Sequence, residues 1–315
     1  MGTKITGASL GSERRQLIYI TSPSYSGSTL LTLMLAMHAR IATIGELKAT
    51  SMGDMNLYQC SCGEKLLECD FWHKVASEMA ARSQPFSLTN FGTHFRGEPH
   101  GSLCDLLLRA NVRGSGVELG RKLGFSMLSH CAEKKAALIR QNEALIEVVS
   151  SFADVDYFLD GSKDPVRLKF FQESEIWDIK VIYIVRDGRG VANSYMRHDD
   201  FDMTRAANEW RKNCQEIRRV MSETPKKNTY FMHYEDFCSD TTGSMAKLYE
   251  FLALDSGQVD SAFNPAKHHI IGNNMRLKFT SEIRQDEKWR TALTDSDLTV
   301  FDKLAGDLNR SLGYS

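Results

Sequence analysis

The fold is decided by one stretch near the start of the chain, QLIYITSPSYSGSTLLTLMLAM at residues 16–37. Residues 16–21 are a short apolar run that indicates a buried strand, and residues 28–37 indicate a helix. The Ser- and Gly-containing residues 22–27 indicate a tight loop between them. This order directs backbone N–H groups and the positive end of a helix dipole at one point, where a phosphate group can bind. The alternative is an ordinary strand-to-helix turn in which Ser28 caps the helix.

Further strands and helices alternate along the rest of the chain. The run Ile41-Ala42-Thr43-Ile44 indicates a strand. Three later apolar runs indicate buried strands, each followed by a helix-like segment: 157–159 then 165–173, 180–185 then 190–196, and 229–232 then 243–252. This alternation predicts an α/β fold, a P-loop-like parallel β-sheet flanked by helices.

The domain organisation follows from the segments that do not alternate. We expect residues 1–15 to be a flexible leader and residues 16–315 to be a single α/β domain. Residues 52–150 have little strand signal and a strong helical pattern from Glu118 to Phe152, so we expect a helical insertion that acts as a lid over an acceptor. Residues 264–290 are polar and aperiodic, which indicates a long ordered loop.

Composition excludes several classes of protein. The chain has 315 residues, of which 42% are hydrophobic and 25% charged, as in packed globular proteins. The net charge of −1 leaves no overall basic surface for nucleic acid, so an anion site must be local. Seven cysteines, an odd number, favour reduced thiols and a cytoplasmic location. We expect no signal peptide and no membrane span, because the sequence lacks a run of about 18 apolar residues.

The phosphate loop departs from the Walker A template of nucleoside triphosphatases. Gly27 and Thr29 occupy the second Gly and the Ser/Thr of that template, but Ser22 replaces its first Gly. Ser28 replaces the lysine that contacts the β- and γ-phosphates. Triphosphate hydrolysis is therefore disfavoured, whereas binding of a less charged 5′-phosphate group is not.

A second anion-binding segment follows a later strand. Arg186 ends the predicted strand, and Ser194 lies eight residues further along the next helix. Ligands of parallel sheets collect at the carboxyl ends of the strands, so this segment and the loop at 22–29 are expected to face one crevice. A ligand with two separated phosphates would fit. The alternative is that Arg186 pairs with a carboxylate such as Asp187 or Asp160.

These residues resemble a known family. Residues 24–31, with residues 184–189 and Ser194, are similar to the two cofactor signatures of sulfotransferases that use 3′-phosphoadenosine 5′-phosphosulfate (PAPS). Three further segments resemble the branch of bacterial and protein-tyrosine sulfotransferases in order and approximate spacing: Ile44-Gly45-Glu46, Ser162-Lys163-Asp164-Pro165 and Tyr234-Glu235-Asp236-Phe237. The resemblance extends from about Leu17 to Trp289.

The resemblance implies a set of cofactor-binding residues. The 5′-phosphosulfate would be held by Ser24, Tyr25, Ser26, Gly27, Ser28 and Thr29. Arg186 and Ser194 would hold the 3′-phosphate, and Tyr234 would be a further contact. Arg276 and Lys278 are candidates in a loop that would close over the nucleotide. The chain departs from the pattern at Tyr25, where many relatives have Lys or Arg, so Lys163 would provide more of the positive charge.

Sulfonate transfer to a hydroxyl is an in-line displacement, which needs a base for the acceptor proton and a cation at the leaving oxygen. By resemblance, Glu46 is the general base and Lys163 stabilises the leaving group. The alternatives are a helix-capping or surface role for Glu46, and pairing of Lys163 with Asp160 or Asp164. Cytosolic relatives of this family use a histidine as the base, but no histidine of this chain stands at the matching position. His198 is expected to be a solvated loop residue. We expect no metal at the reaction site.

The cysteines of the insertion form its most unusual local feature. Cys60, Cys62 and Cys69 with His73 have the residue types of a zinc site. The spacing of Cys60 and Cys62 is tighter than usual, so a disulfide or buried thiols are favoured over zinc.

The sequence therefore favours a PAPS-dependent sulfotransferase that acts on an alcohol or phenol. The alternatives are a nucleotide kinase-like phosphotransferase and a non-catalytic nucleotide-binding module. The class of the hydroxyl acceptor and the oligomeric state stay open, and no nucleic-acid partner is expected.

Overall fold

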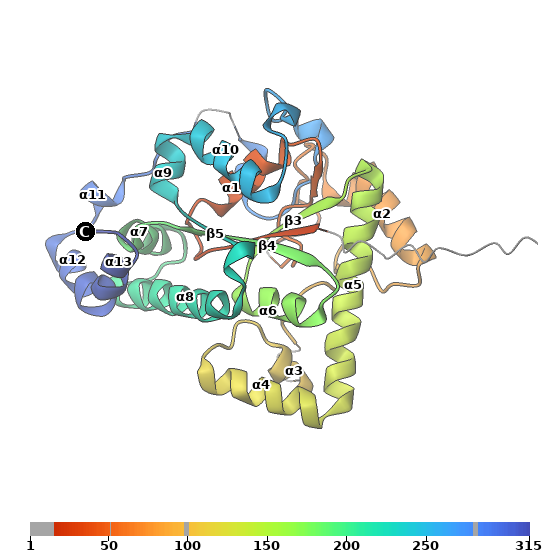
Figure 1. Cartoon of the computed structure of the whole chain (residues 1–315), viewed down its shortest axis with the longest axis horizontal. Helices are drawn as coiled ribbons and strands as arrows, with labels where there is room; N and C mark the ends of the chain where they lie inside the picture. Colours follow the sequence, from red (N-terminus) through yellow and green to blue (C-terminus); the bar gives the residue numbers. More distant parts are fainter. Residues whose placement is uncertain (1–15, 51, 98–100, 280–282) are drawn as a thin grey trace, which may run out of the picture.

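The computed structural model describes residues 16–50, 52–97, 101–279 and 283–315 (Figure 1). The expected leader, residues 1–15, lies outside the described residues. The assignment of the remaining chain to one domain stays a prediction.

A five-stranded sheet forms the centre of the molecule. Its strands are β1 (Gln16–Thr21), β2 (Ile41–Thr43), β3 (Tyr157–Lys163), β4 (Asp178–Val185) and β5 (Thr229–His233). They lie in the order β2-β3-β1-β4-β5, and all four strand pairs are parallel. The register places Leu17 opposite Phe158 on one side and Ile179 on the other. The predicted α/β fold with a parallel sheet is confirmed.

Helices cover both faces of the sheet (Figure 1). One face packs against α1 (Ser28–Ala36), α9 (Tyr234–Ser239) and α10 (Thr241–Leu252). The other face packs against α5 (Ser129–Ala153), α6 (Pro165–Ser174), α7 (Gly188–His198) and α8 (Met203–Glu223). Successive side chains of β1 point to opposite faces of the sheet. Ile18 and Ile20 join the first cluster of buried hydrophobic residues, which lies on the α1 face, whereas Leu17 and Tyr19 join the second cluster, on the α5 and α6 face.

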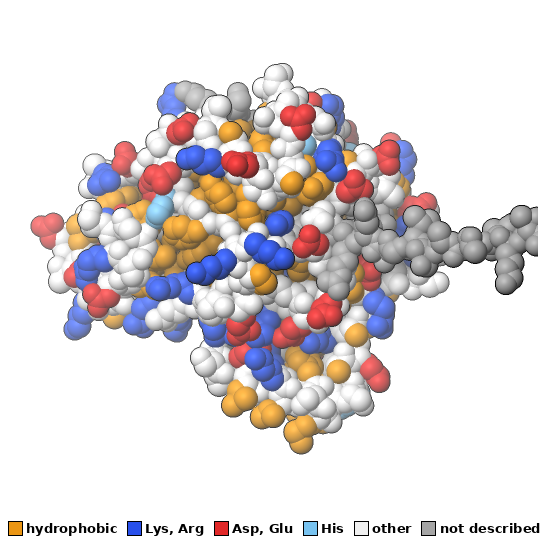
Figure 2. Space-filling model, in the orientation of Figure 1, with side chains coloured by type: hydrophobic (Ala, Val, Ile, Leu, Met, Phe, Trp, Pro, Cys, Tyr) orange, Lys and Arg blue, Asp and Glu red, His pale blue; other side chains and the backbone are white. Residues whose placement is uncertain are grey.

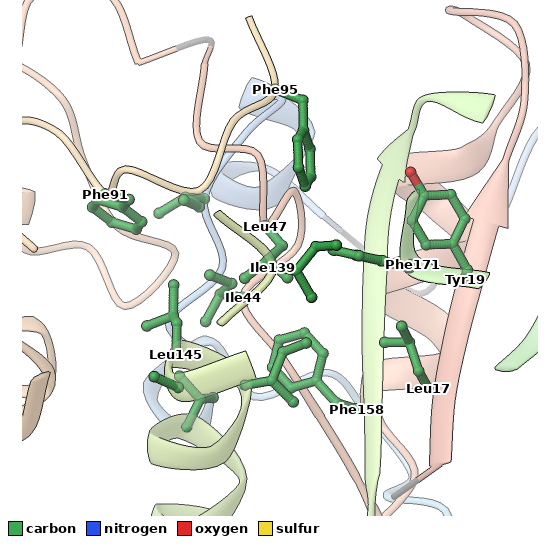
Figure 3. Packing of buried hydrophobic residues seen from close by; sticks show 14 of the residues in the cluster. Leu17, Tyr19, Ile44, Leu47, Phe91, Phe95, Ile139, Leu145, Phe158 and Phe171 are labelled. Atoms are coloured by element: carbon green, nitrogen blue, oxygen red, sulfur yellow. The ribbon is translucent and has the colours of Figure 1, made fainter. Parts of the chain in front are cut away.

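The second cluster connects the sheet to the insertion (Figure 3). Tyr19 meets Phe171 of α6 edge to face, with ring centroids 6.3 Å apart. Ile44 and Leu47, which follow β2, are fully buried in the same cluster as Ile139 of α5. The segment between Ile44 and Leu47 is therefore fixed to the core immediately beside the carboxyl end of β3.

The insertion contains η1 (Leu66–Glu68), α2 (Asp70–Ala81), α3 (Leu103–Leu108), α4 (Ser115–Met127) and α5. The helical pattern expected over 118–152 forms two helices, because Leu128 between them has φ −115° and ψ 89°. A disulfide joins Cys104 to Cys131, so the expectation of reduced thiols is wrong for these two residues. The two cysteines lie on adjacent helices, α3 and α5, a proximity that the sequence spacing does not indicate.

The α3–α4 region projects away from the sheet and presents apolar side chains at its tip (Figures 1 and 2). Leu119, Leu123 and Met127 are 59%, 52% and 78% exposed. None of the described helices is long and apolar enough to cross a membrane.

The C-terminal third adds short elements that the sequence pattern did not indicate. They are η2 (Lys226–Asn228), η3 (Ser256–Gln258), α11 (Trp289–Ala292), α12 (Asp295–Phe301), the π-helical segment η6 (Asp302–Gly306) and α13 (Asp307–Ser311). The stretch predicted as a long ordered loop contains only η4 (Pro265–Lys267), η5 (Asn274–Leu277) and the start of α11 within its described part. Ile271 in this loop forms a parallel bridge with Gly45.

Candidate active site

A cavity of about 620 Å³ opens where the carboxyl ends of β1, β3, β4 and β5 meet the start of α1. Ligands of parallel α/β sheets collect at this edge. The cavity brings together most of the residues that the sequence singled out: Ser24, Tyr25, Gly27, Ser28, Thr29, Glu46, Lys163, Arg186, Ser194, Tyr234 and Lys278. Ser26 and Arg276 do not line it.

The loop before α1 has the geometry of an anion site. Gly27 precedes the helix in the left-handed conformation, with φ 84°, and no side chain caps the helix. The first N–H groups of α1 therefore lack a side-chain partner at the cavity wall. Among the described residues, the buried hydroxyls of Ser22 and Ser26 also have no hydrogen-bond partner. The alternative in which Ser28 caps the helix is not observed.

Gly27 cannot be replaced without moving its neighbour. A Cβ atom built on Gly27 would lie 2.4 Å from Cδ2 of Tyr234, well inside van der Waals contact. Tyr234 follows β5 directly, and its hydroxyl accepts a hydrogen bond from Asp286 N at 3.1 Å. Burial raises the pKa of Tyr234 to about 12, so its hydroxyl stays protonated at neutral pH. The loop before α1 therefore packs against the residue that follows β5, with Gly27 against the Tyr234 ring.

Arg186 is buried at the end of β4 and faces the phosphate loop. Its guanidinium donates to Tyr25 O at 3.1 Å and to Asp286 O at 2.5 Å, and it lies 5.0 Å from the centre of the Tyr234 ring. It pairs with the Asp286 carboxylate at 3.6 Å, not with Asp187 or Asp160 as the alternative had it. Ser194 also lines the cavity, and its hydroxyl donates to Gly190 O within α7.

Glu46 and Lys163 form an ion pair in the wall of the cavity. Lys163 Nζ lies 2.7 Å from Glu46 Oε1, and Lys48 Nζ lies 3.6 Å from Glu46 Oε2. Burial raises the pKa of Glu46, but the ammonium groups of Lys163 and Lys48 outweigh burial and leave the pKa below its usual value of 4.5. Glu46 is therefore ionised at neutral pH and has oxygens that can accept a proton. Lys163 closes β3 with φ 70°, a left-handed conformation that is uncommon for a residue with a side chain.

The position of this pair depends on Asp160, which is completely buried. One Asp160 oxygen accepts hydrogen bonds from Leu47 N at 3.2 Å and from Ser162 N at 2.9 Å. The other accepts from Arg167 Nε at 2.9 Å. Leu47 adjoins Glu46 and Ser162 adjoins Lys163, so Asp160 fixes the backbone on both sides of the ion pair. Both Asp160 oxygens are already bonded to these groups, so Lys163 pairs with Glu46 and not with Asp160.

Tyr25 does not provide a cation, and it is oriented by other side chains. Its hydroxyl donates to Asp199 Oδ2 at 2.8 Å, and its ring stacks on His198 with centroids 5.6 Å apart. His198 is exposed, as predicted, but it is the last residue of α7 and not a loop residue, and it also lines the cavity.

Cations from other segments supply the charge that Tyr25 lacks. Lys48, Arg113 and Arg284 line the cavity besides Lys163, Arg186 and Lys278, against three carboxylates, those of Glu46, Asp164 and Asp286. The sequence motifs do not indicate Lys48, Arg113 or Arg284. Lys48 stands two residues after Glu46, which was a usable signal, whereas Arg113 lies in the insertion with no motif around it. The excess of positive charge suits a ligand with several negative charges.

Arg276 has a different role from the one expected by resemblance. Its guanidinium is buried and donates to Gln59 O at 2.6 Å and to Gly272 O at 2.5 Å. It also lies 4.4 Å from the centre of the Tyr58 ring. These contacts fasten the loop to the insertion, and only Lys278 of the two candidates reaches the cavity.

Part of the chain matches a known family model. Residues 167–308 match the family model of the sulfotransferase domain. No curated protein matches the chain.

Several solved structures are similar in overall arrangement. The sulfotransferase domain of a Synechococcus olefin synthase is 18% identical, with 91% of this chain and 94% of that chain covered and a TM-score of 0.46. A sulfotransferase from Mycobacterium tuberculosis is 12% identical, with 93% and 77% covered and a TM-score of 0.48. A sulfotransferase from Alicyclobacillus acidocaldarius is 11% identical, with 93% and 98% covered and a TM-score of 0.41.

Proposed function

We infer that this chain is a sulfotransferase, the family whose domain its residues 167–308 match, and we propose that it transfers the sulfonate group of PAPS to a hydroxyl acceptor, an alcohol or a phenol. One observation carries the proposal. The ion pair of Glu46 with Lys163, the uncapped start of α1 and the buried Arg186 all line one cavity.

The residues of the cavity fit a nucleotide with two separated anionic groups. The start of α1, with the unpartnered hydroxyl of Ser22, would hold the 5′-phosphosulfate through backbone and hydroxyl donors. Arg186 and Ser194 would hold the 3′-phosphate, and the Tyr234 ring lies 5.0 Å from the Arg186 guanidinium in the same cavity. Lys278 adds a cation from the loop that follows Gly272.

The transfer itself needs two roles beside the bound nucleotide. PAPS, when bound, supplies an activated sulfonate. Glu46 accepts the proton of the acceptor hydroxyl, for which its ionised state is the required one. Lys163 would donate to the leaving phosphate and would neutralise the negative charge that develops there. In the structure the two side chains pair with each other at 2.7 Å, which holds both of them in the cavity wall.

The alternative functions are less well supported. A kinase-like phosphotransferase would need a lysine where Ser28 begins α1. A non-catalytic nucleotide-binding module would need no charged pair such as Glu46 and Lys163 in the cavity wall. The class of acceptor and the lid role of the insertion remain predictions, as does the cytoplasmic location.

Calorimetric titration with 3′-phosphoadenosine 5′-phosphate tests the proposal, run beside ADP and ATP. We expect micromolar or tighter binding of the 3′-phosphorylated nucleotide alone, which corresponds to at least about 8 kcal/mol. Arg186→Ala should weaken that binding by about 1.5–3 kcal/mol, the range for hydrogen bonds to charged groups, and abolish the preference over ADP. The control is Arg290→Ala, since Arg290 is exposed and does not line the cavity. Equal or tighter binding of ATP would favour the kinase-like function instead.

A further inference from the structure

Four potential metal ligands meet outside the cavity, between the insertion and the loop that follows η4. Cys60 and Cys62 lie on a tight hairpin in which Gln59 pairs with Lys65, and Cys69 directly precedes α2. The fourth is His269, about 200 residues further along the chain. The four ligand atoms, three Sγ and His269 Nδ1, lie within 4.8 Å of one another.

Three of the six separations between these atoms match the edges of a zinc tetrahedron, and all six are within 4.8 Å. Bond lengths of about 2.3 Å for Zn–S and about 2.0–2.1 Å for Zn–N give edges of about 3.8 Å between sulfurs and about 3.5 Å between sulfur and nitrogen. In the structure, Cys62 Sγ lies 3.7 Å from Cys69 Sγ. His269 Nδ1 lies 3.6 Å from Cys60 Sγ and 3.4 Å from Cys69 Sγ.

We propose that Cys60, Cys62, Cys69 and His269 bind one zinc ion in a closed structural site. Three thiolates and one imidazole fill all four positions of a tetrahedral ion, so no position is left for a reacting water. Binding releases the thiol protons to solvent, and the thiolates and the ion together carry one negative charge.

The surroundings of the sulfurs suit metal-bound thiolates. The sulfurs of Cys60 and Cys69 are buried, and backbone N–H groups directed at both would stabilise metal-bound thiolates. These donors belong to Cys62, for Cys60, and to Phe71 and Trp72 at the start of α2, for Cys69. A disulfide would use only two of the three sulfurs and would not explain why the third sulfur and the His269 imidazole lie beside them. The structure has all three as free cysteines.

His269 is held in a fixed orientation for this role. Its ring stacks on Phe71 with centroids 4.1 Å apart and planes 2° from parallel. The hairpin residue Ser61 bonds to both neighbours of His269: its hydroxyl donates to His268 O at 2.6 Å and accepts from Ile270 N at 2.8 Å. Such contacts around a ligand fix the ring relative to the ion.

The site lies where it can position the catalytic segment. Ile271, two residues after His269, bonds through its backbone N–H to Ile44 O at 2.8 Å and bridges Gly45. Gly272 then lies so close to Glu46 that a Cβ would stand 3.0 Å from Glu46 Cγ. The zinc ion would therefore join the hairpin to the segment that supports Glu46 and leads to Lys278.

His73, the histidine nearest to the cysteines in sequence, provides a matched control. Its Nε2 bonds to Leu67 O at 2.9 Å, so it is engaged with the backbone and not with the sulfurs. Cys214 is a second control, because it is a buried free cysteine in the separate cluster around Tyr183.

Metal analysis of the purified full-length chain tests the proposal. We expect one zinc per chain in the wild type, and loss of most zinc in His269→Ala and Cys62→Ser. His73→Gln and Cys214→Ala should retain full zinc content. Cobalt(II) exchanged into the site should show the strong visible bands of tetrahedral thiolate coordination, and these should be absent in His269→Ala.

Two outcomes would overturn the proposal. One is wild-type protein without stoichiometric zinc that also fails to take up zinc or cobalt(II) after reduction, a result that does not depend on the folding of any variant. The other is loss of zinc in His73→Gln while His269→Ala retains it. A disulfide between Cys62 and Cys69, found by mass spectrometry without reductant in freshly prepared protein, would explain missing zinc, and zinc uptake is then measured after reduction. Nucleotide binding is measured separately, so failure here leaves the proposed function untouched.

Discussion

Replacing Gly27 by alanine should damage the phosphate loop by two separable effects. The first is backbone strain, because alanine at φ 84° adopts a left-handed conformation that costs about 1–2 kcal/mol. The second is the clash of the new Cβ with the Tyr234 ring at 2.4 Å, and such overpacking costs about 1–3 kcal/mol. We expect Gly27→Ala to lower the free energy of unfolding by about 2–5 kcal/mol when both effects act, which places it among severe single substitutions.

Gly53→Ala isolates the strain, because Gly53 has φ 57° and no atom lies within 4 Å of the position that its Cβ would take. Gly53→Ala should lower the free energy of unfolding only by the strain contribution of about 1–2 kcal/mol. In a double-mutant cycle, Tyr234→Ala should relieve the clash, so Gly27→Ala should cost less in that background than in the wild type. The assays are urea unfolding and calorimetric titration with 3′-phosphoadenosine 5′-phosphate. Equal losses for Gly27→Ala in both backgrounds, or a loss no greater than that of Gly53→Ala, would refute the reasoning.

Three further predictions concern the ion pair and its support. Glu46→Gln should keep nucleotide affinity and lower turnover about 10²–10⁴-fold with any alcohol or phenol that supports wild-type turnover; undiminished turnover would exclude Glu46 as the base. Because the pKa of folded Glu46 is below its usual 4.5, its stabilising contribution is present above that pH and lost as the pH falls through the lower folded value. Urea unfolding between pH 3 and pH 7 should therefore show a weaker acid dependence in Glu46→Gln, and an unchanged slope would contradict the lowered pKa. Asp160→Ala should destabilise by about 3–5 kcal/mol, because it leaves buried Arg167 unpaired, and Asp160→Ala with Arg167→Leu should recover part of the loss in the same assay.

The fold class followed from local sequence because each of its parts is a local pattern. The apolar run 16–21 is observed as β1 with the predicted bounds, and the other predicted strands are all present within a few residues. Helix starts were also readable where chemistry marks them. Asp164 accepts hydrogen bonds from the first amides of α6, and Pro165 occupies its first turn.

Local patterns failed where distant segments decide the outcome. The helical signal over 118–152 did not reveal the break at Leu128 or the disulfide between Cys104 and Cys131. The resemblance places Arg276 in a loop that closes over the nucleotide, but its guanidinium is bonded to the backbone carbonyls of Gln59 and Gly272.

The sequence by itself determined the parallel sheet and the strand-loop-helix order at its start, because strand and helix periodicity depends on neighbours along the chain. Arg186 was a candidate from its place at the end of a predicted strand, and Glu46 and Lys163 were candidates from motifs that resemble a known family. Only the tertiary structure decided which groups meet. It paired Glu46 with Lys163 across 117 residues, brought Arg113 of the insertion to the cavity, and placed His269 rather than His73 beside three cysteines. Such pairings depend on how strands order in the sheet and how loops cross its carboxyl edge, and no spacing within one segment specifies them.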